Sequence, residues 1–191
     1  MGVLKPRVRC ACIVAIVLLF AGRAGTSEIA NAAPTPTPAE VEAVFLFNFS
    51  EFVDWPPQAF SNPGAPIVIG VLGSDPFGAA LDDVVRGEKV NGRGLVVRRF
   101  EHTEDLADCH ILFISRSERG RLQSILEVVK NRSVLTVSDL DDFALEGGVI
   151  GFVEAENKIR LRINLQAAKA AGLTLSSKLL RPAQIVVPRE G

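Results

Sequence analysis

The sequence predicts a single three-layer α/β domain in which a mainly parallel sheet is flanked by helices, with an antiparallel hairpin near the C-terminal part. Two apolar, β-branched runs, 67–72 and 109–114, have the continuous hydrophobicity of strands covered on both faces. Segments with helical spacing alternate with such runs, which is typical of parallel strands joined by helical crossovers. Two later runs, 149–153 and 159–163, flank a short polar turn, so we expect them to pair antiparallel.

Composition and charge limit the classes of function. The chain has 191 residues, of which 48% are hydrophobic and 23% are charged, and this composition excludes a disordered chain. Four of its 21 Lys and Arg and one of its 22 Asp and Glu lie in the first 32 residues. Residues 33–191 therefore hold 17 bases and 21 acids, a formal charge of −4, so we expect no nucleic-acid partner.

The N-terminal residues 1–32 have the pattern of a signal peptide. Three basic residues precede an apolar run over 10–22, and Ala30-Asn31-Ala32 offers small residues at the positions that a signal peptidase reads. The run is shorter than the roughly 20 residues of a membrane-spanning helix, so an uncleaved anchor is the weaker alternative. We expect export and cleavage after Ala32, with a second candidate cleavage site after Ala24.

The first half of the exported part contains a linker, two helices and the first strands. Residues 33–39, Ala-Pro-Thr-Pro-Thr-Pro-Ala, predict an extended linker before a domain over 40–187 and a short tail over 188–191. Apolar residues at helical spacing predict a helix from residue 39 that ends at the prolines 56 and 57. After strand 67–72, Asp75 is placed to cap a helix that begins at Pro76 and ends near residue 86.

The second half continues the alternation. Asn91-Gly92 predicts a tight turn before a strand. The remaining expected strands and helices lie at the following ranges: strands 95–100, 109–114, 134–137, 149–153 and 159–163; helices 115–131, 165–171 and 176–183.

Cysteines and histidines are too few for redox or metal chemistry. Cleavage would leave Cys109 as the single cysteine, so no internal disulfide can form. His102 and His110 are the two histidines, and with one cysteine they do not make a metal or haem site. Cys109 and His110 are neighbours on a strand and point to opposite faces, which argues against a nucleophile and base pair. We expect no catalytic residue, no metal and no cofactor.

Four polar or glycine positions follow expected strands at the edge where clefts form in parallel sheets: Gly73, Asp75, Ser115 and Ser138. They are the candidate ligand contacts. The motif around Gly73 lacks the third glycine of a dinucleotide fingerprint and the Gly-Lys-Ser/Thr ending of a phosphate loop. Turn and cap roles are therefore the alternative for all four.

Three other residues are candidates for contact with a protein partner. Arg160 and Arg162 alternate with apolar residues along the strand 159–163, so they lie on its solvent-facing or partner-facing side. Trp55 follows the first helix, and Arg and Trp concentrate binding energy at interfaces. Solvated arginines and a core tryptophan are the structural alternatives.

The region 40–187 resembles the YfiR-like family of exported bacterial regulators. The resemblance lies in a series of motifs whose order and spacing match the family: Phe45-Leu46-Phe47-Asn48-Phe49, Trp55-Pro56, Ile69-Gly70-Val71-Leu72-Gly73, Asp75-Pro76-Phe77-Gly78, Val90-Asn91-Gly92-Arg93, Cys109-His110-Ile111-Leu112-Phe113-Ile114-Ser115, Gly147-Gly148-Val149-Ile150-Gly151-Phe152, Ile163-Asn164-Leu165 and Ser176-Ser177-Lys178-Leu179-Leu180.

The resemblance implies a periplasmic, non-enzymatic regulator that represses an inner-membrane diguanylate cyclase by binding its periplasmic sensor region. A sensor kinase is a second type of partner, and the resemblance leaves a homodimer open. Some family members contain disulfides between cysteines that this sequence lacks. The alternative function is a periplasmic small-ligand-binding protein of a transport or sensory system, although the roughly 160 residues left after cleavage make only about one domain, and two-lobed binding proteins need more.

Overall fold

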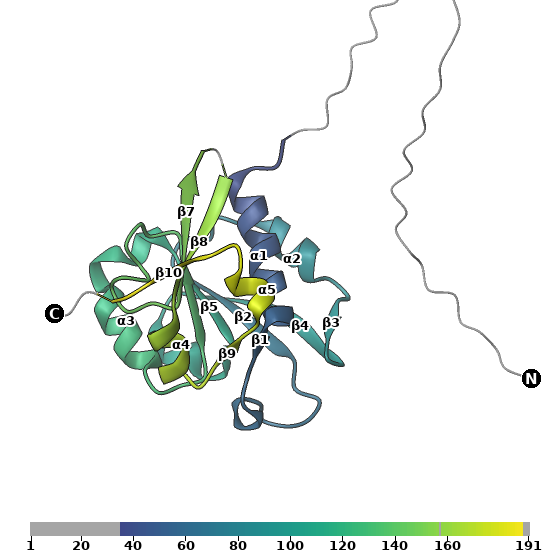
Figure 1. Cartoon of the computed structure of the whole chain (residues 1–191). Helices are drawn as coiled ribbons and strands as arrows, with labels where there is room; N and C mark the ends of the chain where they lie inside the picture. The colour runs from purple at the N-terminus through teal and green to yellow at the C-terminus, as the bar shows by residue number, and fades with distance from the viewer. Residues whose placement is uncertain (1–34, 157, 189–191) are drawn as a thin grey trace, which may run out of the picture. The chain divides into compact units, whose positions relative to one another are not determined.

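The computed structural model describes residues 35–156 and 158–188, and the expected signal peptide with its cleavage sites lies outside this part. Figure 1 shows the elements. The helices are α1 (Pro38–Phe52), α2 (Ala79–Val85), α3 (Leu122–Val129), α4 (Leu165–Ala170) and α5 (Ser177–Leu180), with 3₁₀ turns η1 (Pro57–Ala59), η2 (Thr103–Asp108) and η3 (Arg116–Arg121). The strands are β1 (Val53–Asp54), β2 (Ile67–Leu72), β3 (Lys89–Val90), β4 (Arg93–Phe100), β5 (Ile111–Ile114), β6 (Leu135–Ser138), β7 (Ile150–Ala155), β8 (Lys158–Asn164), β9 (Thr174–Leu175) and β10 (Gln184–Val186).

The predicted fold class is confirmed. An eight-stranded sheet has the order β10-β8-β7-β6-β5-β2-β4-β3, and β4, β2, β5, β6 and β7 run parallel. β7 and β8 form the predicted antiparallel hairpin. β2 is flanked by β4 on one side and by β5 on the other, and both of these strands come later in the chain. The order in which strands are added to the sheet therefore reverses between β2 and β5. The carboxyl ends of β2 and β5 therefore form a topological switch point, the usual place for a cleft in such sheets.

The core has one layer on each face of this sheet. Strand β5 shows the division, because Ile111 and Phe113 pack with α1 and α2 whereas Leu112 and Ile114 pack with α3. All four side chains are fully buried. This explains the continuous apolar run in the sequence, since neither face of the strand meets water.

Helix α1 begins inside the segment expected as a linker. Thr37 and Glu40 form a capping box, in which Thr37 N donates to Glu40 Oε2 at 2.7 Å and Glu40 N donates to Thr37 Oγ1 at 3.3 Å. Pro38 occupies the first turn, where no N–H is needed. The helix ends at Phe52 because Val53 and Asp54 pair with β9, a two-stranded sheet that the sequence pattern did not predict.

Two predicted helices start later than expected. Asp75 does not cap α2, because its Oδ1 accepts a hydrogen bond from Phe77 N at 2.7 Å and so makes a turn instead. Gly78 then precedes the helix with φ +52° and ψ −129°, a conformation reserved for glycine. The expected helix 115–131 begins as the 3₁₀ turn η3, in which Glu118 and Arg121 form an ion pair, and only Leu122–Val129 is α-helical.

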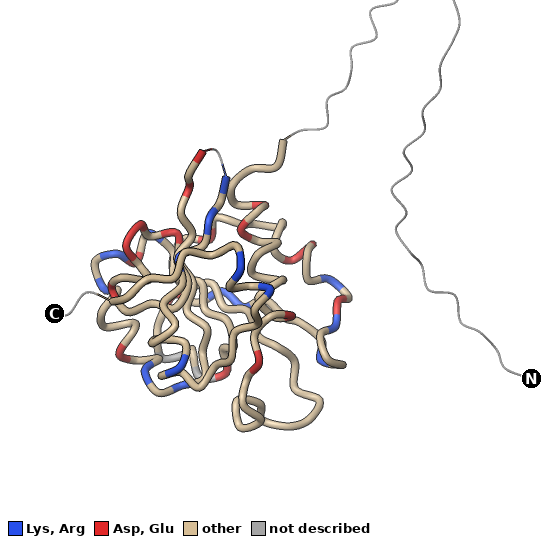
Figure 2. Tube along the Cα trace, in the orientation of Figure 1, with Lys and Arg blue, Asp and Glu red and all other residues tan. Residues whose placement is uncertain are grey.

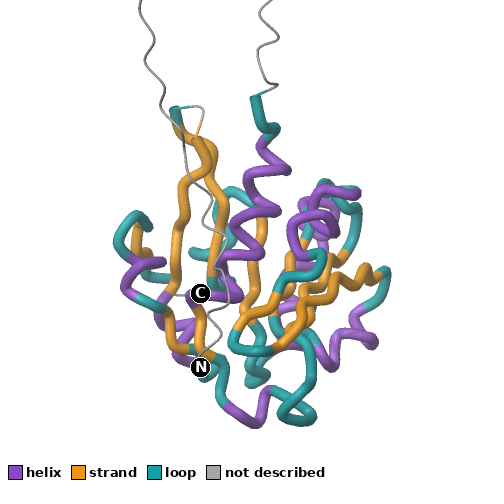
Figure 3. Tube along the Cα trace, turned by 90° about the vertical axis from the view of Figure 1, so that its right-hand side faces the viewer, coloured by secondary structure: helices purple, strands orange, loops and turns teal. Residues whose placement is uncertain are grey.

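The β7–β8 hairpin extends beyond the rest of the sheet (Figure 3). β6 pairs with β7 only up to Gly151, and β10 pairs with β8 from Arg162 onward, whereas β7 and β8 pair as far as Ala155 and Lys158. The outer part of the hairpin therefore has no strand on either side. Phe152 anchors it, since its ring packs 5.9 Å from Phe45 of α1.

Within residues 35–156 and 158–188, no helix has the length and apolarity needed to cross a membrane.

Candidate functional site

Gly73 follows β2 at the switch point. Both its backbone conformation and the side chains packed against it require a glycine at this position. Its φ is +87°, and its N–H donates to Phe100 O at 3.2 Å. A side chain at this position would overlap Ser117 Oγ and the side chain of Glu118. The glycine therefore allows the chain after β2 to pack closely against η3.

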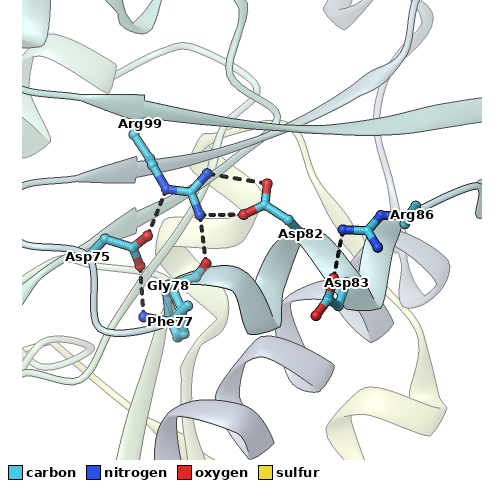
Figure 4. Close-up of polar contacts among 7 residues, drawn as sticks. All are labelled: Asp75, Phe77, Gly78, Asp82, Asp83, Arg86 and Arg99. Atoms are coloured by element: carbon cyan, nitrogen blue, oxygen red, sulfur yellow. Dashed lines mark hydrogen bonds and ion pairs between the residues drawn. The ribbon is translucent and has the colours of Figure 1, made fainter.

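Asp75 is held by Arg99, as Figure 4 shows. Arg99 Nε donates to Asp75 Oδ2 at 2.7 Å, and Arg99 Nη2 donates to Asp82 Oδ2 at 2.6 Å and to Gly78 O at 2.8 Å. The hydrogen bonds from Arg99 are the main reason that the pKa of Asp82 lies below its usual value. With its other oxygen bonded to Phe77 N, Asp75 joins the β2–α2 loop to β4.

Ser115 and Ser138 use their hydroxyl groups within the fold. Ser138 is fully buried, and its Oγ donates to Ile114 O at 2.6 Å and accepts from Leu140 N at 3.1 Å. Ser115 Oγ accepts from Ser117 N at the start of η3. The structure thus brings the four predicted positions to one edge of the sheet, where each makes the turn or cap contact that was the alternative interpretation.

A groove of about 400 Å³ lies next to this edge. None of the four predicted positions lines it. Its walls come from the start of α1, the β2–α2 loop, η3, the loop after β6, and the hairpin: Pro38, Ala39, Glu42, Pro76, Arg116, Asp139, Asp141, Phe152, Val153, Glu154 and Ile159.

Glu42 is the unusual residue of the groove. It is only 8% exposed, and no hydrogen bond or ion pair to its carboxyl group is found in the described part of the chain. Burial, followed by the nearby charge of Asp139, raises the pKa of Glu42 to about 7. The pKa of Glu42 places its ionisation close to neutral pH.

Asp139 and Arg116 form the opposite wall. Arg116 Nε donates to Asp139 Oδ2 at 3.3 Å, and Arg116 Nη2 donates to Asp139 O at 2.6 Å. The other carboxylate oxygen, Asp139 Oδ1, is buried and has no hydrogen-bond partner among the described residues. The groove is thus lined by the carboxyl group of Glu42, whereas Asp139 Oδ1 is closed off from solvent.

The candidates predicted from the sequence omit Glu42 and Arg116. One signal for Glu42 was present, because positions 42, 46, 49 and 53 are spaced by three or four residues and the last three are apolar. A carboxyl group on the buried face of an amphipathic helix is unusual. The residues that face Glu42 could not be found in this way, because Arg116 and Asp139 lie more than 70 residues further along the chain.

Cys109 and His110 occupy different environments, as expected. Cys109 is buried with the α3 layer, and burial raises the pKa of its thiol to about 12. His110 stacks on Phe60 at 4.5 Å, its Nδ1 accepts from Val68 N at 3.1 Å, and burial lowers its pKa. No group of three or more His, Cys, Asp or Glu side chains suited to a metal ion occurs among residues 35–156 and 158–188.

The three candidate partner contacts are separated. Trp55 is half-buried at the amino ends of the parallel strands, where its Nε1 donates to His110 O at 3.2 Å. Arg160 and Arg162 lie on the hairpin at the opposite, carboxyl edge, on the face away from Phe152 and Leu161. Arg160 is 52% exposed, whereas Arg162 donates to Gln184 Oε1 and to Asp141 O.

The sequence profile of one known family, described as YfiR/HmsC-like, matches residues 39–184. The chain belongs to the YfiR/HmsC-like family. This family is regulatory rather than catalytic, its members are known as regulators of diguanylate cyclases, and they are in general periplasmic. A search of curated proteins gave no match to the chain.

The YfiR/HmsC-like match runs from Ala39, the second residue of α1, to Gln184, the first residue of β10. It therefore includes the switch-point edge, the whole protruding hairpin and every residue that lines the groove except Pro38. These features belong to the family domain and not to an added segment.

Proposed function

We propose that this chain is an exported regulator that represses an inner-membrane diguanylate cyclase by binding the cyclase's periplasmic region. The observation that carries the proposal is the YfiR/HmsC-like match over residues 39–184, since the family regulates such cyclases. The N-terminal pattern of residues 1–32 supports export. The four candidate ligand positions make turn and cap contacts within the fold, which supports a protein partner over a small ligand bound at these positions.

The β7–β8 hairpin is the surface we propose for this contact. Beyond Gly151 and Arg162 both of its strands have free edges, and one face presents Val153, Arg160 and Lys158 to solvent. Figure 2 shows basic residues along β8 and acidic residues near the end of β7. The free strand edges suit a partner segment that pairs with them through main-chain hydrogen bonds. The basic residues of β8 suit an acidic surface on the same partner.

Gene deletion tests the proposed function. Loss of the chain should raise cellular cyclic di-GMP, and expression of the chain with residues 1–32 should restore the original level. The same chain without residues 1–32 should fail to restore it, because it would stay in the cytoplasm. Unchanged cyclic di-GMP in the deletion strain under several growth conditions would reject repression and favour the alternative of a small-ligand-binding protein.

A charge reversal tests the surface. Arg160→Glu is preferred to a substitution of Arg162, because Arg162 also donates hydrogen bonds to Gln184 Oε1 and Asp141 O within the fold. In the complemented strain, Arg160→Glu should raise cyclic di-GMP without changing the melting temperature of the purified protein. Arg132→Glu, at an exposed position outside the hairpin, is the matched control and should repress like the unchanged chain. Equal repression by both variants would exclude this face of the hairpin.

A further inference from the structure

His110 joins four segments at the amino ends of the parallel strands. Its N–H donates to Val68 O at 3.0 Å, and its carbonyl oxygen accepts from Leu135 N at 2.8 Å and from Trp55 Nε1 at 3.2 Å. Its ring stacks on Phe60 with the ring centroids 4.5 Å apart and the ring planes at 24°. The residue therefore connects β2, β6, the chain after β1 and the loop that contains η1.

The hydrogen bonds assign a neutral tautomer to this ring. Nδ1 of His110 accepts from Val68 N at 3.1 Å, so Nδ1 carries no proton and the ring proton is on Nε2. His110 is 4% exposed, and Nε2 is buried without a hydrogen-bond partner among the described residues. A proton added to Nδ1 would turn this acceptor into a donor that faces the N–H of Val68, so the hydrogen bond between them would be lost.

The loop over residues 56–66 is attached to the sheet through this ring and through Arg93 of β4 (Figure 1). The Arg93 guanidinium lies over the Phe60 ring at 3.7 Å, and Arg93 Nη1 donates to Asn62 O at 3.2 Å and to Ala65 O at 2.7 Å. Ala65 is the only buried residue of the loop. With so little core of its own, the loop depends for its placement on His110 and Arg93.

We propose that His110 is a pH switch, in which protonation of the ring releases Trp55 and the 56–66 loop while the rest of the domain stays folded. In the closed form, which the structure shows, an imidazolium would lose its bond to Val68 N and repel Arg93. In the open form, water reaches the ring and hydrates both of its N–H groups. The open form also exposes Trp55, and tryptophan is a common anchor residue of protein interfaces.

The charges around His110 determine the direction of the switch. Burial is the main cause that lowers the pKa of His110 below its ordinary value of 6.5, and the charge of Arg93 adds to it. The carbonyl of Ala59 and the carboxylate of Asp108 on η2 act less strongly in the opposite sense. The β2 and β6 residues bonded to His110 and the two aromatic rings beside it are uncharged. The closed form is therefore most stable above pH 6.5 and loses stability as the pH falls below that value.

Hydrogen exchange at two N–H groups of the purified protein tests the proposal. Trp55 is the only tryptophan of the chain, so its Nε1–H gives a single indole signal in NMR, and the second group is the amide of Val68. The protection factor of each should fall about tenfold from about pH 7.5 to about pH 5, because each pH unit below the ordinary pKa favours the open form by up to about tenfold.

The amide of Leu112, in the fully buried strand β5, is the internal reference and should keep its protection. Glu42, whose pKa is raised, changes the stability of the whole domain in the opposite sense over this pH range, so a general loss of stability does not produce the expected pattern. Constant protection of Trp55 and Val68, or an equal loss at all three groups, would overturn the proposal.

The two histidines provide a matched pair of variants. His110→Asn places an amide oxygen near the position of Nδ1, where it accepts from Val68 N but gains no proton, so the protection of Trp55 and Val68 should no longer change with pH. His102 is exposed, and His102→Asn should keep the decrease of the unchanged protein. A decrease that persists in His110→Asn, or one that disappears in His102→Asn, would overturn the proposal.

The ring signals of the unchanged protein give a measurement that needs no variant. The ¹⁵N shifts of His110 should show the Nε2–H tautomer at neutral pH, and the ring should titrate with a midpoint below 6.5. A neutral ring with its proton on Nδ1, or a midpoint at or above 6.5, would overturn the proposal. All of these measurements use the isolated protein, so they are independent of the cyclic di-GMP test of the proposed function.

Discussion

The sulfur atom of Cys109 occupies the space into which a side chain at Gly70 would project. Gly70 lies in the middle of β2, and a methyl group there would overlap Cys109 Sγ and come too close to the ring of Phe100. The backbone angles of Gly70 are available to other residues, so it is space and not conformation that requires glycine. This contact fixes the position of the chain that enters β5 against β2.

Gly70→Ala should therefore destabilise the protein by about 2 kcal/mol, the usual cost of overpacking a core. The double variant Gly70→Ala with Cys109→Ala should recover part of this loss, which urea unfolding of all four proteins in a double-mutant cycle measures. Gly94→Ala is the control, because a methyl group there meets no atom within 4 Å. Additive effects of the two substitutions would contradict the contact.

The thiol of Cys109 should be inert in the folded protein. It is 5% exposed, and its raised pKa of about 12 leaves almost no thiolate at pH 8. Ellman's reagent should label it at the rate of unfolding and not faster, and non-reducing electrophoresis should show no disulfide-linked dimer of the native protein. Rapid labelling without denaturant would show that the thiol is accessible.

The buried carboxyl of Glu42 should make stability decrease with pH. Its pKa is about 4.5 in the unfolded chain and about 7 in the fold, so between these values the folded state binds more protons. Stability from this group is thus lost as pH rises from about 4.5 to about 7, by up to about 3 kcal/mol. Glu42→Gln should raise the melting temperature at pH 8 and leave it nearly unchanged at pH 4.5.

The three-way contact of Arg99 should depend on its planar guanidinium. Arg99→Lys keeps the charge but cannot bond Asp75, Asp82 and Gly78 together, so we expect a loss of about 1 kcal/mol in urea unfolding. Arg98→Lys, on the neighbouring residue, removes only a 3.8 Å ion pair to an exposed Asp108 and should have almost no effect. Similar losses in both variants would mean that the geometry at Arg99 has no special role.

The sequence by itself determined which segments form the longer strands and where one turn lies. The run 67–72 forms β2, and the run 109–114 forms β5 with the two residues before it, because a strand covered on both faces must be apolar throughout. Asn91 and Gly92 both adopt positive φ in the β3–β4 turn, which their residue types allow locally. The hairpin 150–163 followed from its alternation and its short turn.

Only the tertiary structure decided the strand order, the short strands and the groove. β10 and the β1–β9 pair are two or three residues long, and their pairing comes from neighbouring strands and not from their own pattern. Glu42 and Asp139 are 97 positions apart, and they line one groove because α1 packs on a face of the sheet with its first turns at the carboxyl edge. Local sequence specifies which face of an element is apolar, but which elements then share a water-excluding core depends on the packing of the whole chain.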